Sequence, residues 1–420
     1  MTKLATLTLK GLVIALISFT ELSWAAAPRQ KVLYAFQGGT DGMYPQNAMI
    51  FDASGNLYGT TEQGGTIGAG TVFELTPTSN GWNETVLYSF QAGSDGIYPN
   101  SNLVIDAAGN LYGTTLLGGA GDCNGNGCGT VFQLTPPADD GPWTESLVYS
   151  FEGGTDGAFP YGVIIDKSGN LYGATSQGGF ADCGGGFGCG TVFELSSGSG
   201  GWTEMILNSF RGGTQDGSNP QSGLTMDSNG NLYGATYFGG SGSLGTIYEL
   251  SPSNGTWTEK ILFAFTGNGG NGHNPSSTLV FSSQGYLVGT AQGGNPSGCC
   301  GEVFALVPHS GGTWTEIVAF RFNTKNGEVS PPDGSGTLVF DSHGNLYGTG
   351  GGGQYSEGVA YGLKVGAHGV TEAYYSFCPK AGCSTGSDPQ GGLILDGSGN
   401  LYGATATGGL GYGVVYEITP

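Results

Sequence analysis

The segment Leu103-Val-Ile-Asp-Ala-Ala-Gly-Asn-Leu-Tyr-Gly-Thr-Thr115 decides the fold, because versions of it recur along the whole chain. Versions of its second half occur seven times in the chain, at residues 55–61, 109–115, 169–175, 230–236, 285–291, 344–350 and 399–405. Successive copies lie 54 to 61 residues apart. A near-constant interval of this size indicates tandem copies of one structural unit rather than two or three unrelated domains.

Each unit contains four short runs rich in aromatic and β-branched residues, a composition typical of β-strands. In the second unit they are residues 101–106, 110–115, 129–135 and 143–151. The turn Asp106-Ala-Ala-Gly-Asn110 joins the first two runs into a hairpin, in which Gly takes a left-handed conformation. Four-stranded antiparallel sheets repeated in this way predict an all-β, seven-bladed β-propeller. A linear β-solenoid is the alternative, but its coils are usually shorter and lack such hairpins.

The two ends of the repeat predict how the ring closes. Lys31-Val-Leu-Tyr-Ala-Phe36 resembles the fourth run of a unit, whereas Val414-Val-Tyr-Glu-Ile-Thr419 at the other end resembles the third. The last blade therefore lacks its fourth strand, and we expect the N-terminal strand to join it. This pairing removes two exposed sheet edges and makes residues 26–420 a single domain.

Residues 1–25 have the features of a secretory signal peptide: two lysines, an apolar run over residues 11–19 and small residues before the cleavage position. The apolar run is too short to span a bilayer, which needs roughly 20 residues. Removing the two lysines and one glutamate of this segment leaves 9 of 11 basic and 31 of 32 acidic side chains, a net charge near −22. That charge disfavours nucleic acid and anionic lipid as partners. We expect a monomer that is secreted, periplasmic or at the cell surface, without membrane insertion.

Eight cysteines form four close pairs in the sequence: Cys123 with Cys128, Cys183 with Cys189, Cys299 with Cys300, and Cys378 with Cys383. In an exported chain, pairing between these neighbours predicts four disulfides that brace glycine-rich loops. A zinc site is disfavoured, because the pairs lie in different blades and have no histidine beside them. Cross-links this short remove little chain entropy, so we expect local rather than global stabilisation.

In a propeller, the loops between strands two and three leave on the same side as the loops between strand four and the next blade. We call this side the upper face. Its loops are the long ones here, and long loops on a rigid scaffold commonly carry recognition. The candidate ligand-binding residues in them are Asp41, Asp95, Asp156, Asp216, Asn271 and Asp388.

Two hypotheses address these polar residues. One is a ring of carboxylates for Ca²⁺ or for sugar hydroxyls, although the spacing matches no EF-hand loop and the metal signal is weak. The other, which we favour, is that each Asp bonds nearby backbone amides and forms a turn within its own blade. No other cofactor is indicated.

Several phrases resemble a described family, the bacterial GloVer (Gloeo-Verruco) tandem repeat of choice-of-anchor surface proteins. They are Leu-x-x-Asp-x-x-Gly-Asn-Leu-Tyr-Gly-Thr-Thr, Gly-Gly, Gly-Thr-Val-Phe-Glu-Leu and Phe-x-Gly-Gly-x-Asp-Gly-x-x-Pro, and they extend over about residues 31–420. The resemblance implies export, repetition and a place at the bacterial cell surface, and it implies no catalytic residue. The sequence ends at Pro420 without the sorting tail of anchored relatives, which leaves the mode of attachment open.

The residues show no pattern of catalytic groups. The four histidines are scattered, and none is placed beside a nucleophile as an acid–base relay requires. We therefore predict a non-catalytic recognition or scaffold module that binds glycan or protein through the upper face. A carbohydrate-active hydrolase or lyase using upper-face carboxylates such as Glu62 is one alternative, and a purely structural role in the cell envelope is another.

Overall fold

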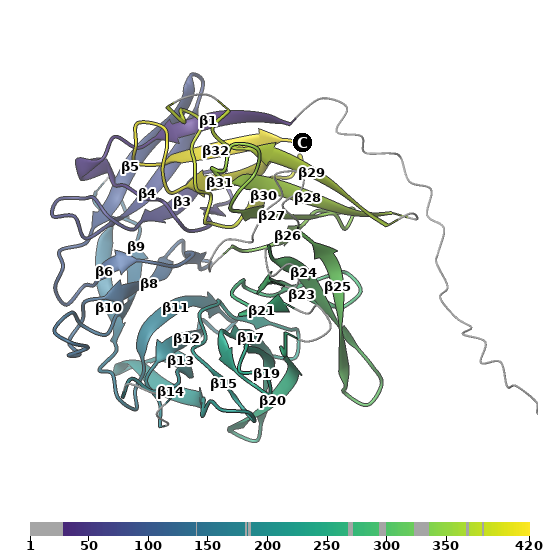
Figure 1. Cartoon of the computed structure of the whole chain (residues 1–420). Coiled ribbons are helices and arrows are strands. Elements are labelled where there is room, and N and C mark those ends of the chain that lie inside the picture. Colours follow the sequence, from purple (N-terminus) through teal and green to yellow (C-terminus); the bar gives the residue numbers. More distant parts are fainter. Residues whose placement is uncertain are drawn as a thin grey trace, which may run out of the picture.

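The computed structural model describes residues 28–139, 141–180, 183, 186–267, 272–293, 300–322, 336–366, 369–379 and 382–420. These residues contain strands β1 to β32, one short 3-10 turn (η1, Gly39–Asp41) and no α-helix. The strands form seven four-stranded antiparallel blades in a ring, which confirms the predicted seven-bladed β-propeller (Figure 1). No helix in the described part of the chain is long and apolar enough to cross a membrane.

The first three blades follow one another along the chain. Blade 1 contains β2 (Ile50–Phe51), β3 (Leu57–Thr61), β4 (Thr71–Thr78) and β5 (Gly81–Ser89). Blade 2 contains β7 (Val104–Ile105), β8 (Leu111–Leu117), β9 (Thr130–Thr135) and β10 (Thr144–Ser150), and β6 (Ile97–Pro99) extends it. Blade 3 contains β11 (Ala158–Ile165), β12 (Leu171–Gln177), β13 (Thr191–Gly198) and β14 (Gly201–Ser209).

Blades 4 and 5 carry short extra strands. Blade 4 contains β16 (Thr225–Met226), β17 (Leu232–Thr236), β19 (Thr246–Ser253) and β20 (Thr256–Ala264), beside the short pair β15 (Gly217–Ser218) and β18 (Phe238–Gly239). Blade 5 contains β22 (Val280–Phe281), β23 (Leu287–Gly293), β24 (Glu302–Pro308) and β25 (Trp314–Arg321), extended by β21 (Gly272–His273).

The last two blades complete the ring. Blade 6 contains β26 (Val339–Phe340), β27 (Leu346–Gly350), β28 (Val359–Gly366) and β29 (Gly369–Ser376). Blade 7 contains β30 (Ile394–Leu395), β31 (Leu401–Thr405) and β32 (Val414–Thr419), and its outer strand is β1 (Arg29–Ala35).

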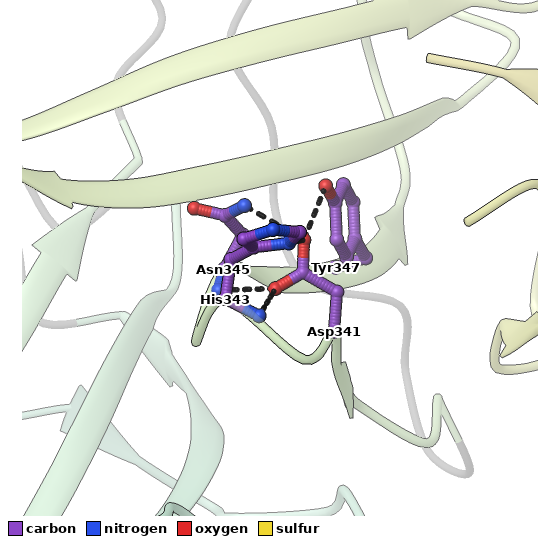
Figure 2. Close-up of polar contacts among 4 residues, drawn as sticks. All are labelled: Asp341, His343, Asn345 and Tyr347. Atoms are coloured by element: carbon purple, nitrogen blue, oxygen red, sulfur yellow. Dashed lines mark hydrogen bonds and ion pairs between the residues drawn. The ribbon is translucent and has the colours of Figure 1, made fainter. Parts of the chain in front are cut away.

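A repeated hydrogen-bond network explains the Asp-x-x-Gly-Asn-Leu-Tyr phrase. In blade 6, Asp341 Oδ1 accepts hydrogen bonds from the backbone N of His343 (2.9 Å) and of Asn345 (2.8 Å). Asp341 Oδ2 accepts from Asn345 Nδ2 (2.7 Å) and from the Tyr347 hydroxyl (3.2 Å), as Figure 2 shows. Gly344 has a φ of 81°, a conformation that glycine adopts readily. The same network surrounds Asp52, Asp106, Asp166, Asp227 and Asp396, and it fixes the first hairpin as predicted.

The hydrophobic core consists of layers between neighbouring blades. Between blades 1 and 2, Val72 and Phe90 pack with Leu111 and Phe132, and all four side chains are fully buried. The tyrosine of the repeated phrase lies in these layers in six blades, as Tyr58, Tyr112, Tyr172, Tyr233, Tyr347 and Tyr402. These tyrosines are therefore part of the hydrophobic core between the blades.

A latch in the upper loops joins each described pair of blades. Tyr98 has a φ of 59° and donates its backbone N–H to the Ala69 carbonyl of the preceding blade (2.9 Å). Pro99 follows, and a Cβ at Gly70 would lie 2.4 Å from Pro99 Cδ, so this contact requires glycine. Equivalent hydrogen bonds are donated by Tyr44, Phe159, Asn219, Asn274 and Asp388, and each of these residues precedes a proline.

The N-terminal strand completes the last blade, as predicted. β1 pairs antiparallel with β32, beginning with Arg29 opposite Thr419. The register of this pair shifts at a β-bulge, as it does where β5, β10, β14 and β20 meet their third strands. The Phe36 backbone N donates to the Gly413 carbonyl (3.1 Å). The ring is therefore closed by backbone hydrogen bonds between its two ends.

One polar side chain crosses the central channel, which holds a cavity of about 260 Å³. Asn102 in blade 2 donates from Nδ2 to Thr337 Oγ1 in blade 6 (2.9 Å). Its Oδ1 accepts from the Ala48 backbone N in blade 1 (2.8 Å). Blades 3, 4 and 7 have glycine at this position, namely Gly162, Gly223 and Gly392. Asn102 therefore ties together three blades that surround the channel.

The Asn102→Ala variant is expected to lower the free energy of unfolding by about 1–3 kcal/mol, because it leaves the Ala48 N–H and the Thr337 hydroxyl without this partner. Urea denaturation followed by tryptophan fluorescence measures the change. Asn80→Ala, in an exposed turn, is the control and should change stability by less than about 0.5 kcal/mol. Equal losses in the two variants would contradict the role assigned to Asn102.

Candidate functional site

The two sets of upper-face loops lie side by side, as predicted. In blade 1, Met43 pairs with Gln63 as an isolated bridge, and the Gly65 backbone N donates to the Gly39 carbonyl (2.7 Å). The equivalent hydrogen bonds join Gly119 to Gly93, Gly179 to Gly154, Gly240 to Asp216 and Gly409 to Cys383. These hydrogen bonds fix the strand two-to-three loops of blades 1, 2, 3, 4 and 7 against the loops that enter the same blades.

Four of the candidate ligand-binding residues, Asp41, Asp95, Asp156 and Asp216, lie half-buried at junctions between blades. Asp41 Oδ2 accepts hydrogen bonds from the Gln37 backbone N (2.8 Å) and from the Tyr34 hydroxyl (3.0 Å). Equivalent hydrogen bonds reach Asp95 from Gln91 and Tyr88, Asp156 from Glu152 and Tyr149, and Asp216 from the Arg211 backbone N. These carboxylates hold their own loops, which favours the turn hypothesis over a ring of carboxylates for a ligand.

Two candidates remain, Asn271 and Asp388. Asn271 lies outside the described residues. Asp388 is exposed, has a φ of 60° and precedes Pro389, so it occupies the latch position of Tyr44 rather than the position of Asp41. Its Oδ2 accepts a hydrogen bond from Gln390 Nε2 (2.9 Å). The described candidates are therefore spread around the ring instead of gathering in one site.

A glutamate from the outer strand of the following blade lies near each junction aspartate. We call these sets the junction carboxyl pairs: Asp41/Glu84, Asp95/Glu145, Asp156/Glu204 and Asp216/Glu259. The pKa of Glu84 and Glu145 is raised to about 7, and the pKa of Glu204 and Glu259 is raised to about 8. Burial is the main cause, and the negative charge of the neighbouring aspartate is the second. Oε1 of each glutamate is buried without a conventional hydrogen-bond partner among the described residues. A proton kept on the glutamate allows a carboxyl-to-carboxylate hydrogen bond, as between Glu259 and Asp216.

Half-buried polar side chains lie at the ends of the upper loops in blades 1, 4 and 5. Gln46 Nε2 donates to Glu62 Oε2 (2.7 Å), and the Tyr237 hydroxyl donates to Gln292 Oε1 (3.2 Å). Gln221 lines the channel cavity. Burial raises the pKa of Glu62. We call these five residues the inner rim; their amide and hydroxyl groups both donate and accept hydrogen bonds.

Exposed apolar side chains concentrate on the strand two-to-three loops. Nine large apolar side chains are exposed in the described part of the chain, and six of them lie in these loops: Ile67, Phe180, Phe187, Phe238, Tyr355 and Leu410. We call these six the apolar tips. Single exposed apolar residues are common on any protein, but here six of the nine lie on the upper face.

Three of the four predicted disulfides are present, namely Cys123–Cys128, Cys183–Cys189 and Cys378–Cys383. Cys299 lies outside the described residues, so its bond to Cys300 stays a prediction. The carbonyl groups of Cys128 and Cys189 accept the latch hydrogen bonds from Phe159 and Asn219. The disulfides therefore brace the upper loops beside the blade junctions. Across the described ranges, no three His, Cys, Asp or Glu side chains are grouped so that they could hold a metal ion.

Replacing Cys123 and Cys128 by Ser is expected to lower the free energy of unfolding by about 2 kcal/mol or less, because the closed loop is short. The larger effect should be local: thermolysin should cleave residues 118–129 faster than in the parent protein. The cysteine-free loop of blade 1, residues 61–71, serves as the internal control. Unchanged cleavage of the blade 2 loop would contradict the bracing role.

Comparison with solved structures shows resemblance of the fold alone. A putative oxidoreductase (glucose dehydrogenase) from Thermus thermophilus is 14% identical over 94% of this chain and 100% of its own, with a TM-score of 0.42. The PQQ-bound aldose sugar dehydrogenase from Streptomyces coelicolor is 12% identical over 94% of this chain and 99% of its own, with a TM-score of 0.43. An ulvan lyase of polysaccharide lyase family PL25 is 12% identical over 80% of this chain and 83% of its own, with a TM-score of 0.45. At these levels the resemblances carry no argument about ligand or reaction.

No curated protein matches the sequence. One family model does, the Gloeobacter/Verrucomicrobia repeat, over residues 24–187 and 179–416. The two matches together span nearly all of the propeller, in agreement with the phrases that repeat from blade to blade. The chain belongs to the Gloeobacter/Verrucomicrobia repeat family.

Proposed function

We propose that this protein is an exported, non-catalytic recognition module that binds a glycan through its upper face. The observation that carries the proposal is the gathering of six exposed apolar side chains, the apolar tips, on the loops around a polar inner rim. A sugar ring presents both C–H faces and hydroxyl groups. Apolar side chains suit the former, and the amides and hydroxyls of the inner rim suit the latter.

The distribution of the apolar tips favours a glycan over a protein. They belong to blades 1, 3, 4, 6 and 7 and are separated by glycine-rich loops. A protein interface usually has one continuous, well-packed apolar centre. A polymer of similar sugar units can instead contact similar loops on successive blades and gain affinity through several weak contacts.

Charge and redox chemistry support export and narrow the ligand. Three disulfides are expected to persist only in an oxidising compartment, in agreement with the predicted signal peptide. The chain has 32 acidic and 11 basic side chains, so an anionic polysaccharide would be repelled at low salt. Neutral or amine-bearing glycans are therefore the expected ligands.

A glycan microarray probed with the mature protein, residues 26–420, tests this function. We expect binding to neutral or amine-bearing polysaccharides and no reducing ends or unsaturated products after long incubation with the bound glycan. Failure to bind any glycan would overturn the proposal. Release of products would replace it with an enzymatic function.

A carbohydrate-active enzyme is the second candidate, and Glu62 is the observation that favours it. The corresponding residues of blades 2, 3 and 4 are Leu116, Ser176 and Tyr237, so this carboxyl breaks the symmetry of the repeat. Its raised pKa, caused by burial, suits a group that donates a proton to a glycosidic oxygen.

Under this second candidate, Glu62→Gln is expected to lower product formation by about a hundredfold or more, with affinity for the glycan changed by less than about twofold. Glu152→Gln, an exposed carboxyl of the same face, is the control. Reducing-end assays and calorimetric titration measure the two quantities. A Glu62→Gln variant as active as the parent would exclude Glu62 as the proton donor.

A further inference from the structure

An aromatic residue that recurs in the outer strands is missing from blade 3. Six blades have an aromatic residue opposite the second residue of the third strand: Tyr34, Tyr88, Tyr149, Phe263, Phe320 and Tyr375. In blade 3 this position, opposite Val192, is Asn208. In the six other blades the ring packs edge-to-face on the phenylalanine two residues later, with centroids 5.0 to 5.2 Å apart. In blade 3 the residue two positions before Phe210 is Asn208, so Phe210 lacks this ring contact.

A groove lies at the position of the missing ring. It is lined by Phe180, Ile206, Leu207, Asn208, Ser209 and Arg211. The Phe180 backbone N donates to Ser209 Oγ (2.8 Å), so the apolar tip of blade 3 is fixed beside the groove. The Phe180 ring does not fill the groove, because 79% of the residue is exposed.

Polar groups that donate hydrogen bonds face the same groove. Arg211 is exposed and forms no salt bridge with any described residue. Asn208 Nδ2 is buried and faces the Glu259 carboxyl, which can accept a hydrogen bond from one of its two N–H groups. The second N–H of this buried amide favours a ligand that supplies an acceptor. The groove thus combines an aromatic wall with two donors, as small-molecule sites commonly do.

We infer that this groove between blades 3 and 4 is the subsite for one pyranose ring of the bound glycan. The inference rests on the proposed function and states where on the molecule one sugar ring binds. Phe180 packs against the C–H face of the sugar, while Arg211 and Asn208 donate hydrogen bonds to its hydroxyl or ring oxygens. Blade 3 has asparagine where the six other blades have an aromatic residue, which makes the groove a feature of blade 3 and not of the repeat.

The Asn208→Tyr variant provides a sharp test, because it restores the residue found in blades 1 and 2. Its ring should occupy the groove and its hydroxyl should bond Asp216, as Tyr88 bonds Asp95. We expect the midpoint of thermal unfolding to rise while the affinity for the glycan falls about tenfold or more. Stabilisation together with lost binding cannot arise from misfolding.

A second variant and matched controls complete the experiment. Phe180→Ala should lower affinity about tenfold without changing thermal stability, because the ring is exposed. Leu147→Ala and Ile317→Ala remove exposed apolar side chains of the outer strands β10 and β25, outside the apolar tips, and should change affinity by less than about twofold. The probes are hexasaccharides of β-1,4-linked glucose, mannose and N-acetylglucosamine, with hexagalacturonate as the anionic comparison, measured by isothermal titration calorimetry.

The outcomes separate the subsite from the function it serves. If the parent protein binds no hexasaccharide, both the proposed function and the subsite are wrong. If the parent protein binds and Asn208→Tyr and Phe180→Ala bind equally well, glycan recognition stands and the groove is wrong. Loss of binding in those two variants, with the controls unchanged, supports the subsite.

Discussion

Deletion of residues 28–36 is expected to abolish cooperative folding of the propeller. These residues contain β1, the outer strand of blade 7, and the side chains Leu33 and Phe36, which are buried in the layer shared with blade 1. Without them β32 becomes an open sheet edge, and the closing layer loses much of its apolar contact. Since total stabilities are typically about 5–15 kcal/mol, the loss of a whole strand should remove most of it.

Differential scanning calorimetry and near-ultraviolet circular dichroism detect this loss. The matched control moves residues 28–36 to the C-terminus behind a short glycine-containing turn, so that β32 and the moved strand form an ordinary hairpin like β4 and β5. We expect this rearranged chain to recover a single sharp transition. A deletion variant that unfolds at the same temperature as the parent would show that the two-ended blade is not needed for stability.

The midpoint of thermal unfolding is expected to fall as pH rises from about 5 to about 9. Burial raises the pKa of Glu84, Glu145 and Glu302 to about 7 and of Glu204 and Glu259 to about 8 in the folded protein. In the unfolded chain a glutamate has a pKa of about 4.3. The folded state thus holds these protons more tightly, so their contribution to stability is complete below the unfolded value and is lost as pH passes through about 7 to 8.

Scanning calorimetry at pH 5, 7 and 9 and constant ionic strength measures this slope. Glu145→Gln should reduce it, because the amide cannot ionise and still donates a hydrogen bond towards Asp95. The high negative charge of the whole chain acts in the same direction, so exposed Glu152→Gln serves as the control for general repulsion. A midpoint that rises between pH 5 and 8 would contradict the protonation of the junction carboxyl pairs.

The blade itself could be predicted from the sequence because its determinants are local. The Asp341 carboxylate bonds groups two to six residues away, and Gly344 supplies the positive φ that the same turn requires. Seven copies of one phrase then determine the number of blades. The closing strand was predictable for the same reason, since β1 has the sequence of an outer strand and β32 that of a third strand.

The contacts between blades were harder to predict because their partners come from different units. Asp41 was predicted to form a turn with its own loop, but its neighbour in space, Glu84, belongs to the next outer strand and could not be found from the loop alone. A signal did exist, since Trp and Glu recur two residues apart at 82–84, 143–145, 202–204, 257–259 and 314–316. Asp388 was grouped with Asp41 by residue type, although the proline that follows it places it at the latch. The groove in blade 3 depends on one exception, Asn208, in a column of aromatic residues.

The pairing of β1 with β32 also sets the order in which the molecule must mature. The first strand of the propeller to be synthesised pairs with the last, so the circle stays open until both strands have been synthesised. During that interval β1 and the edge of blade 1 are exposed to other nascent copies. Assembly of the ring therefore finishes only after the third strand of the last blade is available to β1.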